Sequence, residues 1–135
     1  MRKDLIFTLS LALSFIAMLA IPLSQASDFM VYSVYKSVDL GNTGEVAQKD
    51  FYVNMGTSNG VKTGTKLKVF RMISTFDVTS QKLYKDMSFP IGTIKVIHAE
   101  SNAAIARLDE IESPERTPAT TRAVMVGDKV EISKD

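Results

Sequence analysis

The sequence predicts an all-β domain of five to seven short antiparallel strands, arranged as a small closed barrel or a sandwich. The first observation behind this prediction is that apolar and polar residues alternate with a period of two in several short runs. The second is that clusters of glycine, asparagine and serine separate these runs, as turn residues do. After residue 26, no apolar stripe with helical spacing extends over three turns. Closure is favoured because an open sheet of this size leaves edges that pair with other chains.

The first 26 residues have the three regions of a helical secretory signal peptide. Two basic residues come after the first methionine, an apolar run from Leu5 to Leu23 follows, and the small-residue triplet Ser24–Gln25–Ala26 closes the segment. This order is typical of segments that signal peptidase removes, with the cut here between Ala26 and Ser27. We therefore expect residues 27–135 to form a single domain in the bacterial periplasm.

The same segment has a second interpretation, which is an uncleaved membrane anchor. Its apolar run is close to the roughly 20 residues that a membrane-spanning helix needs. Pro22 and the small residues at the exit favour cleavage, so contact with a membrane is expected only if this segment is retained. The sequence contains no cysteine, which excludes disulfides and lipid attachment through a cysteine.

The charge of the mature chain argues against several classes of partner. The full sequence holds 16 basic and 15 acidic residues, and removal of Arg2, Lys3 and Asp4 leaves equal numbers of each. The most basic stretch, residues 62–71, alternates with apolar positions and is interpreted as a solvated strand face. Because nucleic acids and anionic lipids need a basic stripe or cluster, we expect no nucleic-acid partner and no electrostatic docking on lipid.

Three strands are expected in the first half of the mature chain. Phe29–Leu40 mixes valine and aromatic residues with polar ones, as a long strand does. The runs Phe51–Met55 and Lys66–Val69 alternate apolar and polar residues, so each is a strand with one buried face. Turns are expected at Gly41–Gly44 and at Ser58–Asn59–Gly60, since Asn-Gly accepts positive φ at little cost.

The second half is predicted to continue the pattern. A strand begins after Gly92, and Ser101–Asn102 turns the chain into an alternating strand at Ala104–Leu108. Glu112–Thr121 contains two prolines and is interpreted as a surface loop. The closing strand is expected from Val124 to Ile132, with an interruption at Gly127–Asp128.

Between the two halves, Ser74–Phe89 is predicted to be a long, polar, irregular loop. Within it, Lys82–Tyr84 forms either a short strand or a turn. Its three aromatic residues, Phe76, Tyr84 and Phe89, make it a candidate partner-binding loop, because aromatic side chains are frequent anchors of interfaces. The alternative is that Phe76 and Phe89 fold back and plug the end of the barrel.

Two groups of residues resemble a recurrent module of the bacterial envelope. The first group is a strand ending in glycine, a Gly-Val-x-x-Gly turn and a strand ending in an aromatic–arginine pair, which are Phe51–Gly56, Asn59–Gly64 and Leu67–Arg71. The second group contains Ile91–Val96, Ala104–Leu108 and Val126–Val130. From about Phe51 to Ile132, the chain is similar to the C-terminal domain of flagellar assembly protein T.

This resemblance implies an SH3-like β-barrel without enzymatic activity, which helps to build a periplasmic ring around the flagellar basal body. We therefore expect a binding or scaffold module of a bacterial envelope assembly, with protein partners in the cell envelope. The alternative from another functional class is a cell-wall module that binds peptidoglycan or another glycan. A small hydrolase is disfavoured because the sequence signals no set of nucleophile, base and acid.

His98 is the only histidine and is expected to be structural, because it follows Val96 on the same strand face. A metal site on one histidine would need several carboxylates nearby. Asp109, Glu110 and Glu112 are instead interpreted as a solvated acidic edge. We thus expect no catalytic residue, no cofactor and no metal.

The glycines of the mature chain are expected to fix turns. Gly60 and Gly64 bracket a turn that needs a permissive backbone, and Asp128 caps the turn after Gly127 through its carboxylate. The GxxxG-like spacing of Gly56, Gly60 and Gly64 lacks the apolar helix that a membrane dimer motif requires. The residues expected to form structural turns are Gly56, Gly60, Gly64, Gly92, Gly127 and Asp128.

Overall fold

The computed structural model describes residues 28–38, 41, 44, 47–118 and 122–134. The predicted signal peptide and its cleavage site at Ala26 and Ser27 lie outside these residues. Among the described residues, no helix is long and apolar enough to cross a membrane. Their strands are β1 (Val31–Lys36), β2 (Lys49–Val53), β3 (Lys66–Asp77), β4 (Lys82–Ala99), β5 (Ala104–Ile111) and β6 (Lys129–Ile132), with one 3₁₀ turn, η1 (Thr57–Asn59), between β2 and β3.

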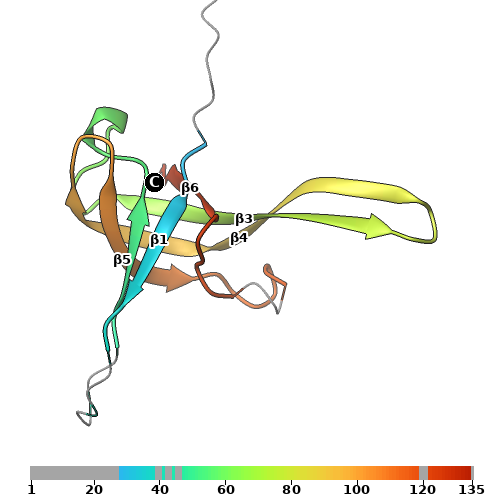
Figure 1. Ribbon diagram of the computed structural model, residues 1–135, viewed down its shortest axis with the longest axis horizontal. Helices are drawn as coiled ribbons and strands as arrows, with labels where there is room; N and C mark the ends of the chain where they lie inside the picture. Colours follow the sequence, from blue (N-terminus) through green and yellow to red (C-terminus); the bar gives the residue numbers. More distant parts are fainter. Residues whose placement is uncertain (1–27, 39–40, 42–43, 45–46, 119–121, 135) are drawn as a thin grey trace, which may run out of the picture.

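The strands form one antiparallel sheet in the order β1-β2-β5-β4-β3-β6, which curls into a half-barrel (Figure 1). The curl brings the first and last strands together at one end. The backbone N–H of Val31 donates to the Asp128 carbonyl at 2.9 Å, and the N–H of Gly127 donates to the Val31 carbonyl at 2.8 Å. The N–H of Val130 donates to the Phe29 carbonyl at 2.9 Å. The predicted all-β class with antiparallel strands is thus confirmed.

The hydrophobic core fills the inside of the curl and follows the predicted alternation. The apolar residues of Phe51–Met55 and of Lys66–Val69 are buried, while Lys66 and Lys68 are exposed, as expected. Leu67, Ile91 and Ile94 are the largest fully buried side chains, and each contributes about 1.5–3 kcal/mol through burial. The other buried apolar residues are Val31, Val61, Val96, Ala104, Ala106, Val124 and Val130.

Gly92 lies inside β4 and not before a strand, which corrects the sequence prediction. It has φ +157°, and a Cβ there would lie 2.2 Å from the Glu110 carbonyl oxygen of β5. Beside Gly92, the pairing of β4 with β3 contains a β-bulge. Val69 pairs with Gly92 and Phe70 pairs with Pro90, so Ile91 is an extra residue on β4. Only glycine allows the two backbones to approach so closely beside this bulge.

The predicted turns after β2 and after β4 are confirmed. Gly60 has φ +85° and Gly64 has φ +90°, the left-handed conformation that glycine adopts without strain. At the hairpin between β4 and β5, the N–H of Glu100 donates to the Ala103 carbonyl at 2.8 Å. Gly56, in contrast, has an ordinary φ of −142° and is required because the backbone at Glu100 passes too close for a Cβ.

The last predicted strand is shorter than expected. Strand β6 covers only Lys129–Ile132, because Gly127 has φ +92° and turns the chain immediately before it. Val124 is still buried in the core, although it lies outside any strand, whereas Val126 is exposed. β1 is also shorter than predicted, and Leu108 is exposed although it continues the alternation of Ala104 and Ala106.

Replacement of Gly92 by alanine is expected to destabilise the protein strongly. The new Cβ would meet the Glu110 carbonyl, and the φ of +157° is unfavourable for any other residue, so we expect a loss of about 2–4 kcal/mol. Gly64→Ala is the matched control, because it also has positive φ but nothing within 4 Å of the added Cβ. It should cost about 1 kcal/mol. Chemical denaturation measures both values, and equal losses would contradict the close approach of β4 and β5.

Candidate functional site

A long two-stranded arm projects from the half-barrel (Figure 1). It consists of Arg71–Asp77 of β3 and Lys82–Phe89 of β4, which pair with each other. Strand β6 pairs with β3 only as far as Phe70, and β5 pairs with β4 only from Gly92 onward. In the described part of the chain, the arm strands thus have no further strand beside them. The segment predicted as an irregular loop is therefore mainly a β-hairpin, and we call it the β3–β4 arm.

The tip of the β3–β4 arm is fixed by the side chain of Asp77. Its carboxylate accepts hydrogen bonds from the Thr79 N–H at 2.9 Å, the Ser80 N–H at 3.3 Å and the Ser80 hydroxyl at 2.5 Å. The Ser80 hydroxyl, followed by these backbone donors, holds the pKa of Asp77 below its ordinary value of 3.8. Gln81 then has φ +55° and completes the reversal into β4.

Both faces of the β3–β4 arm carry exposed apolar side chains. Phe76 lies directly opposite Leu83, so these two residues share one face, and they are 51% and 52% exposed. Tyr84 lies opposite Thr75, on the other face, and is 46% exposed. These exposed apolar side chains on a projecting element are accessible for contact with another molecule.

The base of the arm is anchored by an ion pair between Arg71 and Asp128. Arg71 Nε donates to one carboxylate oxygen of Asp128 at 2.7 Å, and Nη2 donates to the other at 2.8 Å. Nη2 also donates to the Ala123 carbonyl at 2.7 Å. The Asp128 side chain is 3% exposed, and its hydrogen bonds with Arg71 raise the pKa of that guanidinium. The bidentate geometry fixes the direction of the arm relative to the turn before β6.

The carboxylate of Asp128 also caps its own turn, as the sequence predicts. The backbone N–H of Met125 donates to Asp128 Oδ2 at 2.8 Å. The same turn carries the hydrogen bonds that join Gly127 and Asp128 to Val31 of β1. Asp128 therefore connects the arm, the turn and the edge of the sheet. The sequence pattern predicts only the capping role of Asp128, and its pairing with Arg71 is visible only in the folded structure.

The structure separates the three aromatic residues of the predicted binding loop. Phe76 and Tyr84 lie on the outer part of the arm, whereas Phe89 lies at its base and is half-buried. Phe76 does not fold back to plug the end of the barrel, because half of its side chain surface is exposed on β3. Leu83 and Met72 are additional exposed apolar residues of the arm, and no alternation of buried and exposed residues marks them in the sequence.

His98 points away from the core, contrary to the sequence prediction. The register between β4 and β5 shifts between Val96 and His98, and this β-bulge changes the face on which the next side chain lies. His98 Nε2 lies 2.9 Å from Glu100 Oε1, and both side chains are mostly exposed. Among the described residues, no group of three histidine or carboxylate side chains is placed to hold a metal ion.

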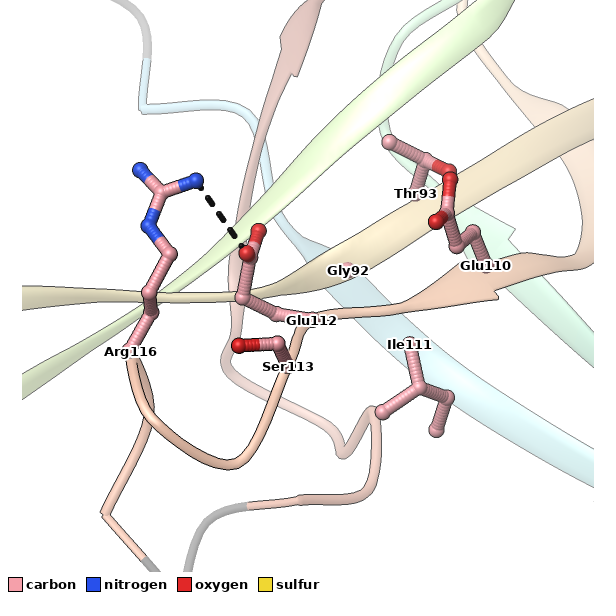
Figure 2. A pocket seen from close by; sticks show the side chains of 7 residues that line it. All are labelled: Gly92, Thr93, Glu110, Ile111, Glu112, Ser113 and Arg116. Atoms are coloured by element: carbon pink, nitrogen blue, oxygen red, sulfur yellow. Dashed lines mark hydrogen bonds and ion pairs between the residues drawn. The ribbon is translucent and has the colours of Figure 1, made fainter.

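A shallow polar cleft of about 360 Å³ lies where β4, β5 and the following loop meet (Figure 2). Glu112 and Arg116 point toward each other across it and form an ion pair at 3.2 Å. Thr93 and Glu110 line its strand side, where the two residues face each other in the register of β4 and β5. Asp109 is paired with Lys66 at 2.9 Å. In the predicted acidic edge, Asp109 and Glu112 are thus each paired with a neighbouring cation.

No family model matches the chain, and no curated protein matches it.

Replacement of Asp128 by asparagine is expected to destabilise the protein by about 3 kcal/mol, because it leaves the guanidinium of Arg71 without its buried counter-charge. Asp50→Asn is the matched control, since Asp50 pairs with Arg107 at 2.7 Å but both side chains are partly exposed. The control should lose about 1 kcal/mol or less. Equal losses in chemical denaturation would show that the Arg71–Asp128 pair is not an anchor.

The tip of the arm is expected to loosen in acid. Because the pKa of Asp77 is lowered in the folded protein, its contribution to stability is complete above pH 3.8 and is lost as the pH falls through the lower, folded value. The amide signals of Thr79 and Ser80 should therefore shift in NMR spectra below pH 3.8. In Asp77→Asn this shift should be absent, and its persistence would assign the titration to another group.

Proposed function

We propose that this chain is an SH3-like β-barrel that acts as a protein-binding or scaffold module of a bacterial envelope assembly, associated with the flagellar basal body. The observation that carries the proposal is the β3–β4 arm. It presents Phe76, Leu83 and Tyr84 at about half exposure on a hairpin that projects from the body. Aromatic side chains displayed in this way are frequent hot spots of protein interfaces.

The anchoring of the arm supports a role in assembly. An isolated two-stranded hairpin is only marginally stable in water. The bidentate contact between Arg71 and Asp128 holds the base of this hairpin against the turn before β6. A pre-ordered arm loses less conformational entropy when it binds, which favours a specific interface.

Two features of the sequence support the family and compartment in this proposal. Arg71 ends the first group of residues that resemble flagellar assembly protein T, and Asp128 lies in the second group. These residues form the ion pair at the base of the arm, so the resemblance includes an interaction that orients the arm. The basic, apolar and small-residue regions of the first 26 residues support a periplasmic location.

One observation favours the alternative of a glycan-binding wall module. Tyr32 of β1 is 49% exposed, and its ring packs edge-on against Tyr52 of β2 with centroids 6.2 Å apart. A tyrosine pair of this kind offers an apolar body and polar tips to a sugar. The purified mature chain should sediment with isolated sacculi if this surface binds peptidoglycan, and Tyr32→Ala should abolish that sedimentation.

The arm proposal predicts that Phe76→Ala and Tyr84→Ala weaken binding without unfolding the protein. The tagged protein is crosslinked in intact cells, and its partners are identified by mass spectrometry. If each aromatic residue is a hot spot worth about 2 kcal/mol, its loss should reduce binding roughly 30-fold. Basal-body ring or rod proteins should be enriched with the wild-type chain and depleted with both variants.

The matched control for this experiment is Tyr35→Ala, which removes an exposed aromatic side chain from β1, outside the arm. It should leave both the partners and the melting temperature unchanged. Enrichment of envelope proteins that does not depend on Phe76 or Tyr84 would contradict the role of the arm. Enrichment of envelope proteins without any flagellar protein would remove the flagellar part of the proposal.

A further inference from the structure

The outer edge of β3 in the arm is open for strand pairing. Along Arg71–Asp77, β3 uses one side to pair with β4, and within the described part of the chain no strand lies on its other side. β6 covers this edge only from Leu67 to Phe70. An uncovered strand edge presents unpaired N–H and carbonyl groups, which readily pair with a strand of another chain.

The length of this open edge limits the registers in which two copies can pair symmetrically. When two identical strands pair as antiparallel neighbours about a two-fold axis, one residue lies opposite itself. Because Phe70 pairs with Lys129, the turn that contains Asp128 lies beside Arg71, and the open edge runs from Met72 to Asp77, where the strand ends. An axis at Ser74 or at Thr75 pairs five residues of this edge with the second copy, and an axis at any other residue pairs fewer. The register with Ser74 on the axis pairs Met72–Phe76 and leaves Asp77 outside the contact.

The side chains agree with this register. Met72 lies opposite Phe76 of the second copy, which joins two side chains that are 37% and 51% exposed in the monomer. Ile73 lies opposite Thr75 of the second copy, a pair of β-branched residues that suits antiparallel strands. No charged side chains of the two copies face each other in this register, because Met72–Phe76 contains none. Moving the axis to Thr75 would place Ile73 opposite Asp77 and Phe76 opposite Ser74, which buries less apolar surface.

We infer that two copies of this chain associate through the β3 edges of their arms, with Ser74 on the two-fold axis. The result is a four-stranded antiparallel sheet, β4-β3-β3-β4, in which Met72 and Phe76 cover each other across the new pair. Because the mature sequence has no net charge, two copies do not repel each other over long distances. This inference rests on the proposed function, because it names a second copy as one partner of the β3–β4 arm.

The contact is small, so the dimer should be reversible in isolation. Copies that are held side by side in an assembly would pair at a much higher effective concentration. The test must therefore report the register even when only a fraction of the chains is paired at any moment.

Cysteine crosslinking provides this test, because the sequence has no cysteine of its own. Directly opposed residues of antiparallel strands have Cα atoms about 4.5–5.5 Å apart, within the range that a disulfide spans. Ser74→Cys should therefore form a covalent dimer under mild oxidation. Thr75→Cys is the matched control, since it is exposed next to Ser74 but lies about two residues from its own copy across the axis. We expect Ser74→Cys to crosslink at least tenfold faster than Thr75→Cys.

Charge variants on the Ser74→Cys background test the same register through the side chains. In the double variant M72K and F76K, the two new lysines of one copy each lie directly opposite a new lysine of the other copy. Their repulsion should slow crosslinking at least tenfold. The pair M72K and F76E places opposite charges there, and should restore most of the rate. Circular dichroism confirms that each variant keeps its β-sheet before it is compared.

Equal crosslinking rates of Ser74→Cys and Thr75→Cys would overturn the inference. It would also be overturned if the two charge variants crosslinked at the same rate. Neither result affects the proposed binding of envelope proteins, because that binding is measured in cells through Phe76→Ala and Tyr84→Ala. A monomeric arm that still captures basal-body proteins would keep the proposed function and remove the second copy as a partner.

Discussion

The bidentate contact between Arg71 and Asp128 joins three parts of the molecule that lie far apart in the sequence. Arg71 is the residue at which β3 leaves the body and enters the arm. Asp128 belongs to the turn whose backbone is hydrogen-bonded to Val31 of β1. A buried ion pair gains little net stability, because both charges must leave water, but it strongly disfavours arrangements in which either charge is unpaired. The pair therefore acts mainly by specifying one geometry: the end of the half-barrel joins β1, and the arm leaves it in one direction.

The arm depends on this geometry because it has almost no core of its own. Its outer residues are exposed on both faces, and its stability comes from cross-strand pairs, from the capped turn at Asp77 and from attachment at its base. The bulges in β4 contribute as well. They add Ile91 to the buried core at the base, and Asp86, with φ +57°, marks a second irregularity farther out. The chain thus combines a well-packed body with a hairpin that exposes apolar surface to other molecules.

The body could be predicted from the sequence and the arm could not, for a physical reason. In Phe51–Met55 and Lys66–Val69 one face is buried and the other is solvated, so apolar and polar residues alternate and reveal the strand. In Arg71–Phe89 both faces are exposed, and burial imposes no such alternation, so the hairpin resembled a loop. The aromatic content still identified Phe76 and Tyr84 as exposed candidates. The orientation of His98 could not be predicted, because the β-bulge that changes its face leaves no local signal in the sequence. The pairing of Arg71 with Asp128 could not be predicted either, because the two residues meet only in the folded chain.

The hydrogen bonds between β1 and the turn before β6 also determine the order in which this protein can fold. Among the described strands, β1 comes first and its partners near Asp128 come just before the last, so the contact joins residues that are far apart in the sequence. Contacts of this kind form slowly, because the entropy of closing a long loop must be overcome before they contribute. The central hairpins β3–β4 and β4–β5 are local and can form early. The two ends of the sheet can join only after the residues around Asp128 are available, so Val31 stays without these partners until the rest of the sheet has formed.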